Sequence, residues 1–287
     1  MRYAFIRAEK GPYPLTILCR VLRVSRSGFY AWNLRKESTR AHNNRALVQH
    51  IRTVHVKSRT TYGSPRIHAE LQAQGIRCSR KRVARLMKKH SIRGPVRRAF
   101  RRTTQSNPTL PVADNLLKRS FDQDKPNAVW VTDITYLRTR EGWLYVAVFL
   151  DVYSRKVVGW SMSERLDTKL VLDAFAMACQ ARKPPKGLIH HSDRGCQYAS
   201  SLYRQHLEQA GLVCSMSRKG NCWDNAVAES FFHTLKAECT DRFDFETRNQ
   251  ARKEVFEYIE VFYNRQRRHS SLGYLSPWEF EQKDFAA

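Results

Sequence analysis

The chain has 287 residues, of which 42% are hydrophobic, so it is long enough for two or three domains and too apolar for wholesale disorder. Its formal net charge is +25; residues 1–110 hold 26 Lys and Arg against three acids, a net of +23, and residues 111–287 hold the remaining +2. A positive block of this kind usually neutralises nucleic-acid phosphates or an anionic membrane surface.

The sequence is unlike that of a membrane protein or a disulfide scaffold. No window approaches the roughly 18 apolar residues that a bilayer-spanning helix needs. The first residues, MRYAFIRAEKGPYP, contain no apolar stretch of signal-peptide length. The seven cysteines form no CxxC pair and are odd in number, so we expect reduced, packed cysteines in a cytoplasmic protein.

Short basic helices are expected through the first third of the chain. Apolar periodicity predicts helices over about 15–22, 26–32, 42–57, 66–73 and 80–90. Ser25 is a suitable N-cap for the second of these helices and Ser79 for the last. We interpret the segments 1–60 and 61–95 as two helix–turn–helix regions. A helical bundle with a solvated basic surface would give the same pattern.

The last of these helices and the segment after it are the strongest candidates for DNA contact. The cations of the helix are Arg80, Lys81, Arg82, Arg85, Lys88 and Lys89. No acid lies between them, whereas a merely solvated helix normally mixes signs to gain pairs four residues apart. Prolines and small polar residues predict a basic linker over 96–124. Its arginine pairs also suit phosphate contact: Arg97, Arg98, Arg101 and Arg102.

The pattern changes near residue 124 to one typical of an α/β domain. Strands are predicted over 128–137, 143–152, 156–162, 188–191 and 212–216. Helices are predicted over 167–181, 198–210, 224–239 and 247–264. The order predicts a mixed five-stranded sheet with flanking helices over 125–265. Residues 266–287 are predicted to be a basic C-terminal tail.

Three acids of this domain are the candidate active site. Asp133 lies in the middle of the first predicted strand, where a charge inside an apolar run needs a partner such as a metal ion. Asp193 follows the short fourth strand, and ligand sites often collect at such strand ends. Glu229 lies about 200° around its helix from the core residue Phe231, so it can project from the polar edge. Each acid alone has a structural explanation. Taken together, one acid on a strand, one at a strand end and one on a helix, in this order, favour an active site.

Carboxylate oxygens suit Mg²⁺ or Mn²⁺, and no His or Cys spacing offers a zinc site instead. Two such ions about 4 Å apart can activate a water or a 3′-hydroxyl and stabilise the leaving oxygen in phosphoryl transfer. Three carboxylates without metal would repel a phosphodiester. The residues therefore indicate a two-metal site that acts on nucleic acid.

The motifs TDITYL, HSDRGCQY and CWDNAVAESFF, with 35 residues between Asp193 and Glu229, resemble the DDE transposase/integrase superfamily. More narrowly, SRSGFYAW, YGSPRIHAEL and YNRQRRHSSLGYLSPWEF resemble the second-frame protein (OrfB) of the insertion-sequence-three family of bacterial transposases. This resemblance covers most of the chain. It implies an RNase H-like core with Asp133, Asp193 and Glu229 as the catalytic, metal-binding triad. Lys236, seven residues past Glu229, matches the basic residue of the family on that helix and is expected to contact DNA.

Other positions have two interpretations each. His191, which precedes the second acid, is either a DNA contact or a packed strand-end histidine. Arg267 lies on a basic segment that could reach the active-site DNA, whereas a packing role is the safer interpretation for Tyr263 and Leu272 of the same segment. Asp151 is either an acid behind the site or a surface turn residue. Asp224 is a candidate cap for the catalytic helix.

The predicted function is DNA strand cleavage and strand transfer that moves an insertion element. The resemblance implies that one element end is nicked and joined to the other, giving a circular intermediate that later integrates. The expected partners are the terminal inverted repeats, target DNA, further copies of this chain, and an upstream first-frame protein, fused or separate. The expected location is the bacterial cytoplasm, on the nucleoid.

Three other functions compete with this one. A repressor that only binds DNA would not need the intact triad. An RNase H-like nuclease that cuts without joining would not need the long basic N-terminal region. A retroviral-type integrase is disfavoured because no His-His-Cys-Cys arrangement precedes the core.

Overall fold

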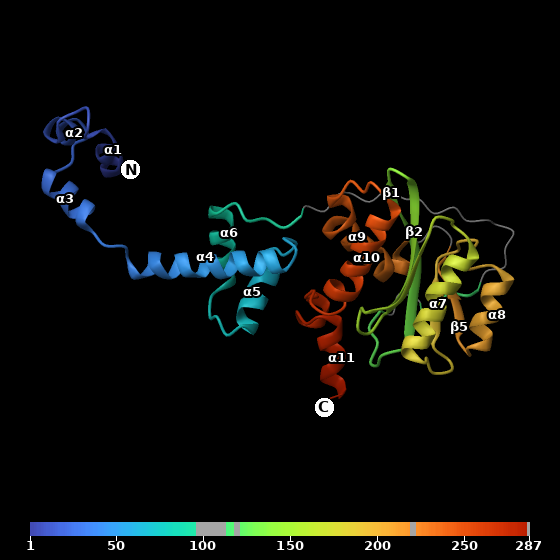
Figure 1. Cartoon of the computed structure of the whole chain (residues 1–287). Helices are drawn as coiled ribbons and strands as arrows, with labels where there is room; N and C mark the ends of the chain where they lie inside the picture. The colour runs from blue at the N-terminus through green and yellow to red at the C-terminus, as the bar shows by residue number, and fades with distance from the viewer. Residues whose placement is uncertain (96–112, 118–120, 219–221, 286–287) are drawn as a thin grey trace. The chain divides into compact units, whose positions relative to one another are not determined.

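The computed structural model describes residues 1–95, 113–117, 121–218 and 222–285 (Figure 1). The chain forms two compact units, Met1–Ile51 and Arg52–Ala287. Their boundary lies inside helix α4 (Thr39–Lys57). The expected helix–turn–helix segment 61–95 therefore belongs to the same unit as the sheet domain. Among the described helices, none combines the length and the apolar character that a membrane crossing needs.

The first unit contains α1 (Arg2–Glu9), α2 (Leu15–Val21), α3 (Arg26–Leu34) and most of α4. Its small core is built on Ile6, Cys19 and Phe29, one residue from each of the first three helices. The hydroxyl of Ser25 accepts a hydrogen bond from the Gly28 amide at 3.0 Å, which confirms the predicted cap of α3. α1 was not predicted, because Ile6 is its only buried residue and gives no periodic signal.

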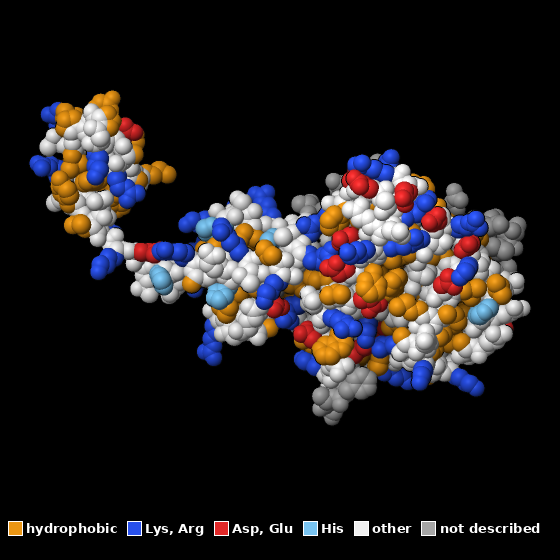
Figure 2. All heavy atoms as spheres, viewed as in Figure 1, with side chains coloured by type: hydrophobic (Ala, Val, Ile, Leu, Met, Phe, Trp, Pro, Cys, Tyr) orange, Lys and Arg blue, Asp and Glu red, His pale blue; other side chains and the backbone are white. Residues whose placement is uncertain are grey.

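In the second unit the end of α4 is followed by α5 (Ser64–Ala73) and α6 (Arg80–Lys89), which pack against each other. The hydroxyl of Ser79 accepts from the Arg82 amide at 3.2 Å and caps α6 as predicted. Val83, Leu86 and Met87 form the buried side of α6. Among the charged side chains on the face drawn in Figure 2, blue Lys and Arg predominate over the N-terminal helices, whereas both signs of charge lie over the sheet domain.

Polar contacts join the start of this unit to its C-terminal part. Arg66 of α5 forms an ion pair with Glu238 at 3.2 Å. The hydroxyl of Tyr62 accepts from the Arg268 amide at 2.7 Å and donates to the Gln266 carbonyl at 3.2 Å. These contacts explain why α5 is part of the larger unit.

The sheet has the order β3-β2-β1-β4-β5. Its strands are β1 (Val129–Thr139), β2 (Gly142–Asp151), β3 (Val157–Ser163), β4 (Ile189–Ser192) and β5 (Val213–Met216). The first three pair antiparallel, β4 pairs with β1 in parallel, and β5 pairs with β4 in parallel. Gly142, with φ +121°, allows the tight turn between β1 and β2. The mixed five-stranded sheet is therefore confirmed.

Helices cover both faces of this sheet (Figure 1). One face carries α7 (Thr168–Arg182) and α8 (Ser201–Gln209), with Trp130, Phe149 and Tyr203 in the core between them and the sheet. A Cβ on Gly159 would lie 2.3 Å from the Ala174 carbonyl oxygen, so only glycine lets α7 approach β3 this closely. The other face carries α9 (Ala226–Glu238), after the 3₁₀ turn η1 (Cys222–Asn225), and α10 (Arg248–Phe256).

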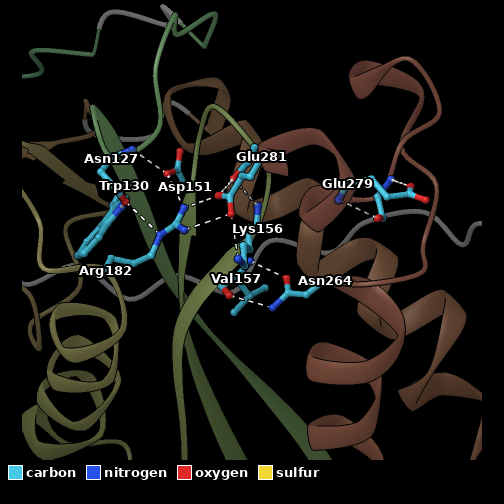
Figure 3. A network of polar contacts seen from close by, with 11 residues as sticks. Asn127, Trp130, Asp151, Lys156, Val157, Arg182, Asn264, Glu279 and Glu281 are labelled. Carbon is cyan, nitrogen blue, oxygen red and sulfur yellow. Dashed lines mark hydrogen bonds and ion pairs between the residues drawn. The ribbon is translucent and has the colours of Figure 1, made fainter. Parts of the chain in front are cut away.

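The C-terminal segment differs from the expected basic tail. After the 3₁₀ turn η2 (Thr240–Arg242), α10 continues as the π-helix η3 (Glu257–Tyr263), followed by the 3₁₀ turn η4 (Ser270–Leu272) and helix α11 (Pro277–Phe285). Residues 266–287 hold three Lys and Arg and three acids, so they are not basic. Glu281 of α11 is buried and accepts from Lys156 at 2.9 Å and from Arg182 at 3.1 Å (Figure 3). These ion pairs fix the segment to the sheet.

Candidate active site

The parallel register of β1 and β4 determines where the first two acids lie. The two strands pair only at Val129–Ile189, Trp130–His190 and Val131–His191. Asp133 lies two residues beyond Val131, and Asp193 lies two residues beyond His191. Because neighbouring strands are about 4.8 Å apart, this register brings the two acids to one point at the end of β4.

Both acids are held by backbone amides. The Ile134 amide donates to Asp133 Oδ1 at 2.8 Å, and the Gly195 amide donates to Asp193 Oδ1 at 2.9 Å. Burial and then the charge of Asp193 raise the pKa of Asp133 well above its usual value. The charge of Glu229 raises it further, whereas the Ile134 amide and Lys236 lower it. Burial also raises the pKa of Asp193. The charges of Asp193 and Glu229 therefore lie near enough to Asp133 to raise its pKa, in a region that is partly shielded from water.

The start of α9 is tied directly to the strand that carries Asp133. Asn225, the N-cap residue of α9, donates from Nδ2 to the Thr132 carbonyl at 3.2 Å. Asp224 is fully buried and accepts from Asn115 at 2.8 Å and from the Arg218 amide at 3.0 Å. The structure thus puts Asn225 rather than Asp224 at the cap. Both contacts fix the helix whose first turn bears Glu229.

The donor set fits a divalent cation. Within the described ranges, no three or more His, Cys, Asp or Glu side chains are gathered closely enough to enclose a metal ion. Asp133 and Asp193 nevertheless share one strand end, and their repulsion raises the pKa of Asp133. A cation between them would remove this repulsion, and oxygen ligands suit Mg²⁺ or Mn²⁺.

Lys236 lies at the edge of this site. Its Nζ is 5.3 Å from the centroid of the Tyr136 ring, and its charge lowers the pKa of Asp133. Tyr136 in turn meets Trp143 edge to face, with ring centroids 5.1 Å apart. Both rings are exposed, at 37% and 47%. This aromatic pair was not expected from the sequence, although an exposed aromatic on each strand of a predicted hairpin is a signal for such a pair.

Three family descriptions match the chain: HTH-like domain over residues 42–100, and Integrase core domain over 123–222 and again over 229–285. The insertion element IS600 uncharacterized 31 kDa protein of Shigella sonnei is 49% identical over 266 residues, which are 93% of this chain and 98% of that protein. Transposase InsF for insertion sequence IS3A of Escherichia coli K12 is 45% identical over 290 residues and 100% of both chains. The chain belongs to the insertion-sequence-three family of DNA transposases.

The comparison with solved structures also finds integrase cores. The HTLV-2 integrase catalytic core domain in complex with magnesium matches with a TM-score of 0.42 and 16% identity, covering 54% of the transposase and 96% of that chain. The family resemblance found in TDITYL, HSDRGCQY and CWDNAVAESFF is confirmed by the full-length relatives.

Two expected DNA contacts of the transposase need correction. His191 is fully buried, and its ring nitrogens bond Ser215 at 2.8 Å and Ser217 at 3.0 Å. Burial lowers the pKa of His191 to about 4, so the ring is a neutral packing group. Arg267 is also buried and donates to Glu238 at 2.6 and 2.7 Å. Its side chain therefore helps to hold the fold together.

Asp151 is neither an acid behind the active site nor a surface turn residue. It is fully buried and accepts from the Asn127 and Tyr153 amides at 2.8 and 2.9 Å, and Arg182 lies 3.3 Å away (Figure 3). It faces Trp130 across the β1–β2 pair, three register positions from Asp133. We assign Asp151 to the network that fixes α7 and α11 to the sheet.

The basic helix remains a candidate DNA contact. Its exposed cations are Arg80, Lys81, Arg85, Lys88 and Lys89, and Arg82 is partly buried. Val83, Leu86 and Met87 are the buried residues of α6, so the exposed cations lie on the other side of the helix. The linker arginines Arg97, Arg98, Arg101 and Arg102 lie outside the described residues.

Proposed function

We propose that Asp133, Asp193 and Glu229 are the metal-binding catalytic residues with which this transposase cleaves and joins DNA strands. The observation that carries this proposal is the β1–β4 register, which sends Asp133 and Asp193 to the same strand end. The influence of Glu229 on the pKa of Asp133 supports its membership in the site. Two ions, Mg²⁺ or Mn²⁺, would activate the attacking oxygen and stabilise the leaving one.

Each step exchanges one phosphorus–oxygen bond for another. In cleavage, a water oxygen attacks the phosphorus at an element end, and the 3′ oxygen leaves and takes up a proton. In joining, that 3′-hydroxyl attacks a second phosphodiester, loses its proton and displaces another 3′ oxygen. The residues of this chain orient the phosphate and balance its charge: the carboxylates through the metal, and Lys236 from the edge of the site.

The reaction needs two DNA segments at one site, so we propose that the protein acts as an oligomer on the terminal inverted repeats and target DNA. We also propose that an upstream first-frame protein, fused or separate, contributes to end recognition. The exposed cations of α6 and the basic N-terminal unit would supply phosphate contacts. Since the similar proteins come from bacteria, the place of action would be the bacterial cytoplasm, on the nucleoid.

The test incubates the full chain, Mg²⁺ and a plasmid carrying the element ends. We compare wild type with Glu229→Gln and with a matched control, Glu208→Gln, on the exposed surface of α8. We expect nicked and joined products from wild type and control and none from Glu229→Gln. Identical products from all three proteins would show that the assignment of Glu229 is wrong. Binding without products would favour the repressor, and cleavage without joining would favour the nuclease.

A further inference from the structure

A cavity of about 300 Å³ lies against α9, on a side of the helix away from Glu229. Val227, Ser230 and Thr234 line it from the helix. These positions lie about 100–160° around the helix from Glu229, whereas Lys236 shares the Glu229 side. One helix thus carries both the proposed active site and one wall of a separate cavity, and Ser230 directly follows Glu229 in the chain.

The remaining walls come from α5, the β2–β3 turn and the C-terminal segment. Their polar side chains are Arg66, Arg155, Tyr263, Arg267, His269, Ser270 and Ser271. No Asp or Glu is among the described residues that line the cavity. A volume near 300 Å³ is at the lower end of the roughly 300–1,000 Å³ that small-ligand sites occupy.

The arginines of this cavity outnumber the carboxylates that contact them. Glu238, which lies behind the wall, accepts from Arg267 at 2.6 and 2.7 Å and from Arg66 at 3.2 Å. One carboxylate therefore serves two arginines. Arg155 is the third arginine of the lining. Its side chain donates to the Phe121 carbonyl at 3.3 Å. Asp122 and then Asp151 act on Arg155 electrostatically, and Arg182 lies 3.3 Å from the Asp151 carboxylate.

The charges of the cavity repel one another. Burial and then the charges of Arg267, Arg66 and Arg155 lower the pKa of His269 well below its usual value. Burial and then the charge of Arg267 also lower the pKa of Arg66. An anion in the cavity would relieve this repulsion, because desolvated charges interact more strongly than charges in water.

We propose that this cavity binds a phosphate group of a DNA strand, at a distance from the phosphate that is cut. Guanidinium groups match phosphate oxygens with two parallel hydrogen bonds, and the exposed hydroxyls of Ser270 and Ser271 can donate to the same oxygens. Because α9 carries both Glu229 and one wall of the cavity, a strand engaged at the active site can continue around this helix to the cavity. This inference rests on the proposed function. Free phosphate offers the same chemistry, and the experiment separates the two sources.

The test uses the full chain with two cavity variants and one control. Arg155→Gln removes a guanidinium, and Ser271→Glu places a carboxylate at an exposed position of the lining. Arg252→Gln removes the same charge from α10, outside the lining. Thermal unfolding is measured in sodium phosphate and in sodium chloride of equal ionic strength. Binding to element-end DNA is measured by fluorescence anisotropy.

We expect phosphate to raise the Tm of wild type and Arg252→Gln above the value in chloride, and to do so much less for the two cavity variants. The cavity variants should bind element-end DNA about tenfold more weakly than Arg252→Gln, as expected for one lost charge-assisted contact. Because Ser271 is exposed, Ser271→Glu should not disturb folding. This variant therefore tests phosphate binding by the cavity even if Arg155→Gln does not fold.

Equal behaviour of all three variants in both measurements would overturn the proposal. Stabilisation by phosphate with unchanged DNA affinity would also overturn it, because the ligand would then be a free anion. Both results would leave the Glu229-dependent joining reaction of wild type intact. Failure of the proposed function is a different result, in which wild type and Glu229→Gln give the same DNA products.

Discussion

Lys236 lies over the ring of Tyr136, with Nζ 5.3 Å from the ring centroid. This contact joins the last turn of α9 to β1, three residues beyond Asp133. The lysine is therefore positioned by the strand that carries the first acid, as well as by the helix that carries Glu229. A cation–π contact of this kind is worth about 0.5–2 kcal/mol.

Two variants should separate the charge of Lys236 from its positioning. Lys236→Met removes a phosphate contact, so the slope of log affinity against log salt for element-end DNA should become less negative by about 0.9. Tyr136→Leu keeps the charge, so this slope should not change. Its strand-transfer rate should nevertheless fall roughly 2- to 30-fold, the equivalent of the lost cation–π contact.

The control for this pair is Lys253→Met, an exposed lysine of α10. It should keep both the slope and the rate of wild type. A normal rate in Tyr136→Leu would show that the tyrosine does not position the lysine.

The buried pair of Arg267 and Glu238 should be essential for stability. Glu238→Gln would leave two arginines, Arg66 and Arg267, without their shared carboxylate. Breaking a buried ion pair from one side costs about 3–5 kcal/mol. Urea unfolding should show a loss of this size, whereas Arg265→Met, at an exposed position of the same segment, should change stability by less than about 0.5 kcal/mol. A small effect of Glu238→Gln would mean that the pair is not a main support of the C-terminal segment.

Local pattern predicted the sheet domain well. β1 was expected over 128–137 and spans Val129–Thr139, because an apolar, β-branched run ends at a glycine turn. The caps at Ser25 and Ser79 were also predictable, since a cap depends on a few neighbouring residues. The β1–β4 register was not predictable, because it depends on packing between segments about 60 residues apart.

Residues whose partners are distant in the sequence account for the errors. Arg267 was expected at DNA because its neighbours are basic, but Glu238, 29 residues earlier, pairs with it. The C-terminal segment was expected to be a tail, because Glu281 gives no local sign of its ion pair with Lys156, 125 residues earlier. Charge counts along the chain cannot distinguish a cation that meets solvent from one that meets a buried carboxylate.

The buried, neutral side chain of His191 should make the protein less stable in acid. Burial lowers the pKa of His191 to about 4, whereas an unfolded histidine titrates near 6.5. Between these values the unfolded chain binds more protons than the folded one, so the free energy of unfolding falls as the pH falls from about 6.5 toward 4. Going from about pH 7 to pH 5 should cost about 2 kcal/mol through this residue.

His191→Gln keeps a side chain that can bond Ser215 and Ser217 but removes the titration. Its unfolding free energy should therefore depend less on pH than that of wild type, by about the same 2 kcal/mol over this range. Urea titrations at both pH values measure the difference. Parallel pH profiles would contradict the assignment of His191 as a buried, neutral group.

The exposed cations of α6 should determine much of the salt dependence of DNA binding. Arg85 and Lys88 are exposed, one turn apart, opposite the buried face formed by Val83 and Leu86. If each neutralises one phosphate, the double variant Arg85→Gln/Lys88→Gln should make the salt slope less negative by about 1.8. The control Lys169→Gln removes an exposed lysine that already pairs with Asp173 at 2.6 Å, and it should leave the slope unchanged. An unchanged slope in the double variant would remove α6 from the DNA interface, even if the overall affinity of the protein stayed high.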